Sequence, residues 1–481
     1  MTDVITEGAA GRQPLRGGDL WTSRPVLQHI QTLARARMVG PHAVLAYAVA
    51  EAVATIPPYI TLEPVIGGPG SLNMCIAITG RSGAGKGTAA AAARDGVICS
   101  YPVGPVARVP IGSGEGIART YRPQGTPAEG PNQVTAAIFS AEEIDTWSAI
   151  ASRTGSTLSA EVRKMFSGEQ LGFGNAGKDT RNVVEAHSYR ALVVVGVQPE
   201  QSGPILEAAD GGLPQRFWWV PASDPDAPDD PPEAPEPYLV PSAEWHLEVS
   251  SGNIPNGHLV IPEEARTVIV RARQAVLREE PDADPLAAHA LLTRLKLAAG
   301  LMALDGRGWI TAEDWHLAGD LMEVSDSTRD RCRRALTDRS RRANTARALA
   351  TVEREEIAAE RRLARARATI LRKIDARGQL TKNQLRQAMK ADIRDYLEPA
   401  LSDLLDAQEI DVSPGTSGTH KVHVYHRYTD EKQRTTSGDG ACTKSTRVPQ
   451  RRDLARNRSQ HQRQRTRGKF RTGQQTGEAT A

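Results

Sequence analysis

The stretch from Ser71 to Asp95 constrains the fold of this chain more than any other part of the sequence. It reads SLNMCIAITG, then RSGAGKGT, then AAAAARD. The apolar run 72–79 suits a buried parallel strand, and the alanines after Thr88 have high helix propensity. Between them lies a glycine-rich turn with the spacing Gly-x-x-x-x-Gly-Lys. Strand, turn and helix in this order predict a phosphate-binding loop.

The residues of this loop are of the types that phosphate binding needs. Glycines allow backbone N–H groups to point at phosphate oxygens, and the N-terminus of the following helix adds positive potential. The lysine places a positive charge on the β- and γ-phosphates of ATP. We therefore expect an ATP site formed by Gly80, Arg81, Ser82, Gly83, Ala84, Gly85, Lys86, Gly87 and Thr88. The alternative is a glycine-rich turn with a structural role.

One residue of the loop departs from the usual pattern. Gly87 follows the lysine where Ser or Thr is normal, so Thr88 lies one position late. The sequence of this loop resembles the GxxGxGKGT loop of adenylate kinases. Mg²⁺ ligation by Thr88 is therefore a hypothesis, and a nucleotide or small-molecule kinase is an alternative function. Such kinases carry an Arg-rich mobile lid after the core and no C-terminal DNA-binding module.

A pair of acids follows another predicted strand further along the chain. The apolar segment 134–139 ends in Ser-Ala and then Glu142 and Glu143. In an ATPase, the first acid of such a pair holds Mg²⁺, usually through water, and the second polarises the attacking water. We predict these roles for Glu142 and Glu143. The alternative is two solvated acids at a helix start, where the helix dipole favours them.

Two further polar residues flank predicted strands. Gln198 follows the apolar strand 191–197, and ligands gather at the carboxyl ends of parallel strands. We predict that Gln198 reads the γ-phosphate, against the alternative that it only begins a turn. Arg216 precedes the strand 217–220 and is a candidate arginine finger for a neighbouring subunit, since its planar fork stabilises transferring phosphoryl groups. The alternative is a structural ion pair.

Composition places the chain among globular proteins. Charged residues make up 24% and hydrophobic residues 39% of the 481 positions, so a core can form. The four cysteines are scattered without CxxC spacing, which favours reduced thiols over a disulfide framework or zinc site. The N-terminus lacks an apolar signal segment, and no apolar run approaches about 20 residues. We expect a cytoplasmic protein that does not contact a membrane.

The distribution of turn signals and charge predicts several segments. Helices are expected over 25–56 with a break at Gly40-Pro41, and a helix with a capping box begins at Thr311. Arg294 or Lys296 of the predicted helical lid could reach the nucleotide, against the alternative of an ordinary surface charge. The predicted segments are a polar arm 1–18, an ATPase core 19–222, an acidic Pro-rich linker 223–240, a helical lid 241–336, a charged helix 337–367, a C-terminal domain 368–428 and a basic tail 429–481.

The C-terminal domain has the order of a winged helix: three helices and then a β-hairpin. Glu398 and Asp403 on the third helix disfavour close contact with a DNA groove. Basic side chains favour DNA contact, and the candidates are Lys382, Arg386, Lys390, Arg394, Lys421 and Arg427. A protein-docking role is the alternative.

Other basic segments are less specific. Lys178 and Arg181 lie in a Gly-rich segment that suits contacts to a nucleic-acid backbone or a plain exposed loop. The tail can neutralise phosphates or simply keep the protein soluble. The Arg/Ala/Glu-rich region 329–367 favours a solvated, ion-paired helix face with no specific site. The loop 112–116 is either a substrate contact or an ordinary strand-to-helix turn.

These parts together resemble the P-loop ATPases of phages and integrated plasmids of GC-rich bacteria, similar to the helicase portion of primase–helicase replication proteins. The resemblance rests on GRSGAGKGT, AAIFSAEEID, LVVVGVQPEQ, GGLPQRFWW and TAEDWHLA. It implies an α/β core of RecA/AAA+ type, ATP and Mg²⁺, DNA as partner, a homo-oligomeric ring and a separate primase. We predict an ATP-hydrolysing DNA motor, either a replicative helicase or a helicase loader. The other alternative is a non-catalytic DNA-binding regulator switched by ATP.

Overall fold

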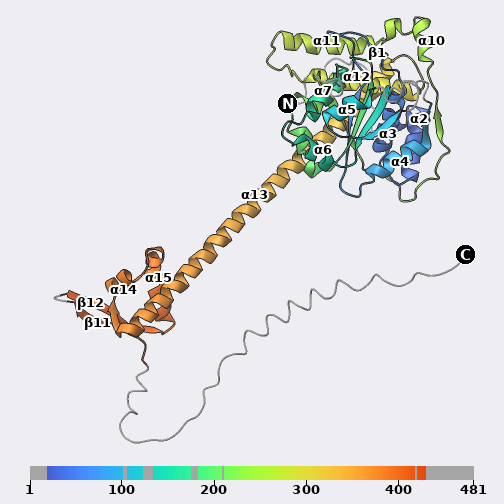
Figure 1. The fold of residues 1–481 in the computed structure, drawn as a ribbon. Coiled ribbons are helices and arrows are strands. Elements are labelled where there is room, and N and C mark those ends of the chain that lie inside the picture. Colours follow the sequence, from blue (N-terminus) through green and yellow to red (C-terminus); the bar gives the residue numbers. More distant parts are fainter. Residues whose placement is uncertain are drawn as a thin grey trace, which may run out of the picture. The chain divides into compact units, whose positions relative to one another are not determined.

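The computed structural model describes residues 19–100, 106–122, 134–174, 183–208, 211–417 and 420–429 (Figure 1). Two compact units divide between Ala348 and Leu349, and each is described by itself. The predicted arm 1–18 and nearly all of the predicted tail lie outside the described residues.

The centre of the first unit is a five-stranded sheet in which every neighbouring pair of strands is parallel. The strands in spatial order are β4 (Ala107–Pro110), β5 (Ala136–Ala141), β6 (Arg190–Val197), β2 (Met74–Thr79) and β7 (Phe217–Pro221). Four of them, β2, β5, β6 and β7, match the apolar runs 72–79, 134–139, 191–197 and 217–220 that the sequence predicts as strands. All residues of β2, β6 and β7 are buried, as expected of strands covered on both faces. The α/β class with a parallel sheet is therefore confirmed.

Helices cover both faces of this sheet. Because side chains alternate along a strand, Ile76 faces one core and Ala77 faces the other. The first core includes α2 (Pro25–Ala36), α3 (Pro41–Ala54), α4 (Lys86–Gly96) and α12 (Ala287–Leu304). The second includes α5 (Gly114–Thr120), α6 (Ile144–Ala151), α7 (Leu158–Ser167) and α8 (Gly203–Leu206). The predicted helix break at Gly40-Pro41 is confirmed.

The expected lid shares the core of the sheet. Gly300 of α12 lies so close to α3 that an added Cβ would stand 2.6 Å from Val49 Cγ1. By length and composition α12 is apolar enough to cross a membrane, with a mean hydropathy of 1.3, but 61% of it is buried in the protein. A helix buried in the core of a protein can have the same length and apolar composition.

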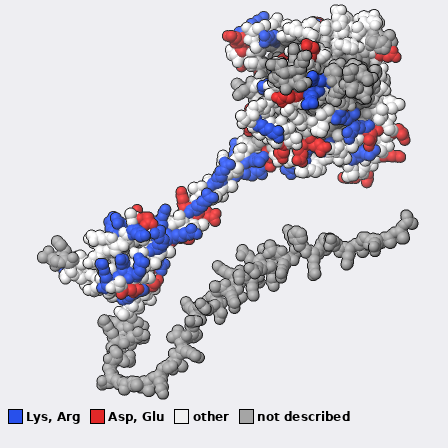
Figure 2. All heavy atoms as spheres, in the orientation of Figure 1, with Lys and Arg blue, Asp and Glu red and all other residues white. Residues whose placement is uncertain are grey.

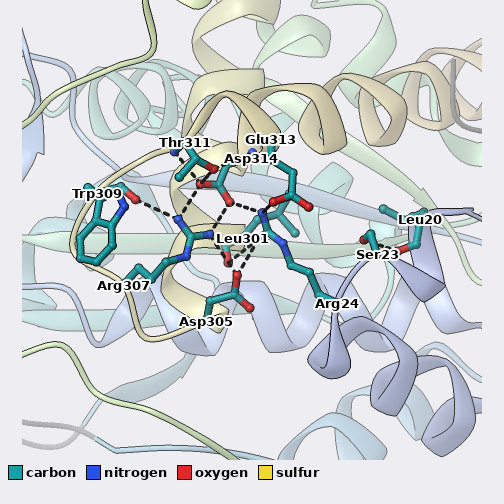
Figure 3. Close-up of polar contacts among 10 residues, drawn as sticks. All are labelled: Leu20, Ser23, Arg24, Leu301, Asp305, Arg307, Trp309, Thr311, Glu313 and Asp314. Carbon is teal, nitrogen blue, oxygen red and sulfur yellow. Dashed lines mark hydrogen bonds and ion pairs between the residues drawn. The ribbon is translucent and has the colours of Figure 1, made fainter. Parts of the chain in front are cut away.

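A network of charged side chains joins the first helices of the chain to the end of α12 and the start of α13 (Ala312–Arg377) (Figure 3). Arg24 is 6% exposed and forms ion pairs with Asp305 (2.9 Å) and Asp314 (2.7 Å). Arg307 donates two hydrogen bonds to the fully buried Asp314, at 2.7 and 2.9 Å. Asp314 also accepts from the N–H of Thr311, whose hydroxyl accepts from the N–H of Asp314. The predicted cap at Thr311 is thus confirmed.

The acidic segment after β7 is anchored at both ends. Asp224 pairs with Arg35 of α2 at 2.9 Å. Residues Tyr238–Val240 form β8, which pairs in parallel with β3 (Val97–Cys99). The last three residues of the predicted linker 223–240 are therefore a strand.

Shorter elements complete the first unit. They are α1 (Asp19–Thr22), β1 (Thr61–Leu62) paired with β9 (His258–Leu259), η1 (Pro199–Gln201), α9 (Leu213–Arg216), α10 (Trp245–Ser250), η3 (Pro255–Gly257) and α11 (Glu263–Leu277). The three cysteines in the described part of the chain are buried free thiols, as predicted, and Cys442 lies outside it.

The second unit begins within α13, which continues without a break through the predicted boundary at residues 367 and 368. After Gly378, with φ of 77°, follow β10 (Gln379–Thr381), α14 (Lys382–Ala388), η4 (Ala391–Tyr396), α15 (Leu397–Asp406), β11 (Ile410–Ser417) and β12 (His420–Arg427). Thr381 caps α14 through a capping box with Gln384. The strands form an antiparallel sheet in the order β10-β12-β11.

Candidate functional site

The glycine-rich loop connects the end of β2 at Thr79 to the start of α4 at Lys86. Gly83 and Gly85 adopt φ of 80° and 75°, which favour glycine. A Cβ on Gly80 would lie 2.8 Å from Ala84 Cβ and 3.0 Å from Ala222 Cβ. The glycines are therefore needed for the backbone path itself.

The first turn of α4 faces this loop with its backbone N–H groups. The N–H groups at the start of a helix have no intrahelical partner, and the helix dipole makes this end positive. Gly85 occupies the N-cap position, where no side chain caps the helix. Backbone N–H groups of residues 86–88 thus remain at the surface that an anion would meet.

Lys86 closes the loop on itself. Its Nζ donates hydrogen bonds to the carbonyl oxygens of Gly80 (3.0 Å) and Arg81 (3.1 Å). Burial lowers the pKa of Lys86 below its usual value, and the carboxylate of Glu143 acts in the opposite direction. The ammonium group is therefore held at the centre of the loop by groups that a phosphate can replace.

The acid pair lies at the same edge of the sheet as the loop. Glu142 and Glu143 follow the last residue of β5, and β6 lies between β5 and β2. Because parallel strands end at one edge, both acids line a cavity of about 480 Å³ together with Gly83–Thr88. The sequence predicts this grouping, and the structure brings these residues together.

Gly196 of β6 makes this arrangement possible and was not singled out from the sequence. A Cβ at this position would lie 2.0 Å from the Glu142 carbonyl oxygen and 3.3 Å from Lys86 Cε. The signal was a lone glycine inside the otherwise branched run ALVVVGV, which often marks a close backbone approach.

Gly196→Ala should therefore displace the backbone that carries the acid pair. We expect a loss of about 1–3 kcal/mol in the free energy of unfolding and weaker ATP binding. Urea denaturation and a titration with a fluorescent ATP analogue measure the two effects. Gly112→Ala is the control, since a Cβ there meets nothing within 4 Å. Equal behaviour of the two variants would contradict the packing role of Gly196.

Four other residues that line the cavity were also not predicted: Tyr47, Glu51, Arg94 and Arg108. Arg108 on β4 donates to both carboxylate oxygens of Glu51, at 2.8 and 2.9 Å. Burial, with a smaller contribution from Glu142, raises the pKa of Tyr47 to about 12. Helix α3, which carries Tyr47 and Glu51, showed only an apolar periodicity in the sequence.

Two predicted site residues lie apart from this cavity. Gln198 follows β6 at the same edge of the sheet, but it does not line the cavity. Arg216 precedes β7 at the opposite edge, because Phe217 pairs with Cys75 near the start of β2. It is 8% exposed and donates to the Gly211 carbonyl at 2.7 Å. Its role in a neighbouring subunit stays a prediction.

The two candidate cations of the lid do not reach the loop. Lys296 is fully buried and donates to the carbonyl oxygens of Asn73 (2.8 Å) and Phe166. Asn73 precedes β2, so Lys296 lies at the edge opposite the loop. Arg294 donates to the Trp315 carbonyl at 2.8 Å. The expectation that either reaches the nucleotide is wrong for this conformation.

The loop 112–116 is the start of α5 after β4. Ser113 is the N-cap of α5, and its hydroxyl accepts a hydrogen bond from the N–H of Gly116 at 3.3 Å. The loop does not line the cavity, which favours the ordinary strand-to-helix turn.

The predicted DNA contacts fall into three groups. Lys178 and Arg181 lie outside the described residues. Lys382 pairs with Glu398, Arg427 pairs with Asp375 at 2.6 Å, and Arg394 donates to the Met389 carbonyl. Arg386, Lys390 and Lys421 have no carboxylate within ion-pair distance among the residues that the structure describes.

No cluster of three or more His, Cys, Asp or Glu side chains with metal-site geometry occurs in the described ranges. A Mg²⁺ ion that binds with a nucleotide needs only one or two protein ligands beside the phosphates, and Thr88 and Glu142 fit that need. No known protein-family model matches the chain, and no curated protein matches it.

Proposed function

We propose that this chain is an ATP-hydrolysing DNA motor with a phosphate-loop core of RecA/AAA+ type, acting as a replicative helicase or helicase loader of a phage- or plasmid-type element. One observation carries the proposal. The glycine-rich loop, Lys86 and the acid pair Glu142 and Glu143 line one cavity at the carboxyl edge of a parallel sheet. This is the set of groups that phosphoryl transfer to water requires.

Each group has a distinct task. The N–H groups at the start of α4 bind phosphate oxygens, and Lys86 exchanges its two carbonyl partners for the β- and γ-phosphates. Glu143 orients the attacking water and accepts its proton. Thr88 and Glu142 would hold Mg²⁺, which would neutralise negative charge on the phosphates. Gln198 would read the γ-phosphate, and Arg216 would act only in a ring of subunits.

The second unit supports a role on DNA. A helix, a short strand, two more helices and an antiparallel hairpin follow in the order of a winged helix. Arg386, Lys390 and Lys421 are the predicted contacts that no carboxylate neutralises in the described part of the chain. Basic side chains of this kind neutralise phosphates in a salt-dependent manner.

A second candidate function is a small-molecule phosphotransferase. The observation that favours it is that two arginines, Arg94 and Arg108, line the same cavity as the glycine-rich loop. An anionic acceptor would suit these two arginines, although Arg108 is already paired with Glu51. A phosphorylated acceptor among the products would support this alternative, whereas stimulation of ATP hydrolysis by DNA supports the motor.

The test is ATP hydrolysis by the wild-type chain and Glu143→Gln, with and without single-stranded DNA. We expect DNA to stimulate the wild type. The variant should bind ATP normally but hydrolyse it about 10²- to 10⁴-fold more slowly, because the general base is lost. Glu233→Gln, in the exposed acidic segment, is the matched control and should hydrolyse normally. Unchanged turnover in Glu143→Gln would refute the assignment.

A further inference from the structure

Helix α13 carries a dense set of arginines in its part that belongs to the first unit. Residues 329–347 contain eight arginines and two aspartates. We name Arg331, Arg334, Arg341 and Arg342 the arginine ridge. All four are exposed, Arg341 to 78% and Arg342 to 67%. Figure 2 shows Lys and Arg side chains along this helix.

The four arginines project from one side of the helix. The last three lie 3, 10 and 11 residues after Arg331, and this spacing places all four side chains on a common face of the helix. Cys332, on the other side of the helix, is buried. At a rise of about 1.5 Å per residue, the ridge extends about 16 Å along the helix axis. The ridge therefore presents a solvent-facing row of positive charge.

Acidic partners neutralise only part of this charge. Arg331 donates only to the Thr328 hydroxyl, at 3.4 Å, and Arg334 has no polar partner among the described residues. Arg341 lies 4.0 Å from Asp338, and both side chains are exposed, so this pair contributes little. Arg342 pairs with Glu200 at 2.9 Å.

The next part of the same helix differs. Residues 353–362 contain four glutamates among three arginines, which fits the predicted ion-paired face. The ridge lacks such interleaving, and like charges three or four residues apart destabilise a helix slightly. A solvated face with only a structural role would not need this surplus.

We propose that the arginine ridge binds the phosphate backbone of a polynucleotide, and this inference rests on the proposed function on DNA. The guanidinium fork matches phosphate oxygens bidentately, as it does carboxylates, and a row of such forks suits the row of phosphates along a polynucleotide. A length of about 16 Å corresponds to about five nucleotide steps of 3.4 Å each. Arg342 connects the ridge, through Glu200, to the segment that follows Gln198 at the carboxyl edge of the sheet.

The test compares two triple variants of the full chain. Arg331→Gln, Arg334→Gln and Arg341→Gln together remove three ridge charges, and glutamine keeps the helix propensity. The control combines Arg354→Gln, Arg361→Gln and Arg362→Gln, which remove the same charge from exposed positions of the interleaved stretch. Binding of a fluorescent 20-nucleotide single-stranded DNA is measured by anisotropy over a range of salt concentrations.

We expect the ridge variant to bind DNA at least about tenfold more weakly, with a slope of log K against log salt that is smaller by about 2. The control should keep the wild-type slope. Equal losses in both variants, or a wild-type slope in the ridge variant, would overturn the inference while DNA-stimulated hydrolysis still supported the motor. A wild-type chain that binds no DNA would remove both proposals. The same oligonucleotide as RNA shows which polymer the ridge prefers.

Discussion

Lys86→Ala should abolish detectable ATP hydrolysis, with a fall in kcat/KM of about 10³-fold or more. The lysine supplies a preorganised positive charge where negative charge accumulates on the transferring phosphoryl group, and loss of one such group costs about 10²- to 10³-fold in kcat alone. Weaker ATP binding adds to this loss. Steady-state hydrolysis and ATP titration measure the two contributions separately.

The same variant should fold normally. Lys86 is the half-buried first residue of α4, and its ammonium group donates to only two backbone carbonyls, so the free energy of unfolding should change by less than about 0.5 kcal/mol. Lys373→Ala, in the second unit, is the control for loss of one positive charge. A Lys86→Ala protein that hydrolyses ATP at the wild-type rate would show that the loop is structural.

Asp314→Asn should cause the largest loss of stability among single substitutions in the charged network of Figure 3. Asp314 is fully buried between Arg24 and Arg307, and Arg24 is itself 6% exposed. Removal of one partner from a buried ion pair leaves a buried charge without compensation and costs about 3–5 kcal/mol. Urea denaturation of the full chain should show this loss in the transition of the first unit.

Asp330→Asn is the matched control for this change. Asp330 also lies on α13 and pairs with an arginine, Arg333. The Asp330 side chain is 58% exposed and the Arg333 side chain is 50% exposed. An exposed pair contributes at most about 1 kcal/mol. Equal losses in the two aspartate variants would mean that burial of the network has no special effect.

The pH dependence of stability provides an independent check on Asp314. Burial alone raises its pKa, but hydrogen bonds from Arg307 and Thr311 and the charge of Arg24 outweigh burial, so the pKa lies below the ordinary value of 3.8. The unfolded chain therefore binds a proton at higher pH than the folded chain. The stabilisation is complete above the ordinary pKa and is lost as pH falls through the folded value. Asp314→Asn should lack this part of the acid transition.

The sequence predicted most of the sheet because four of its strands are apolar and largely buried. β2, β5, β6 and β7 coincide with such runs, and the turn chemistry at Gly40-Pro41 and Thr311 gave correct helix boundaries. β3 and β8 were missed because strands of three residues carry no usable periodicity and pair across a long sequence separation.

The extent of α13 was also missed for a physical reason. The fall in hydrophobicity after Leu336 suggested a new segment, and the rise near residue 368 suggested another. No glycine or proline occurs from residue 320 to residue 377, so the backbone has no reason to leave the helix at either predicted boundary. Composition changed along this helix while the backbone conformation did not.

Within the candidate site, the sequence identified the groups that follow a strand or belong to the loop. It could not tell which cations lie at the same edge of the sheet, and so Arg294 and Lys296 could not be excluded as contacts of the nucleotide. It also could not predict Tyr47, Glu51 and Arg108, because these residues meet the loop only through the packing of α3 and the pairing of β4 with β5.

The charged network around Arg24 determines where this protein can be truncated. A shortened version that starts at Pro25 would lose Arg24, and one that stops before Thr311 would lose Asp314. Either would keep the glycine-rich loop but leave charged members of this buried network without a partner. The smallest recombinant piece able to hold a nucleotide should therefore run from Asp19 into the first turns of α13.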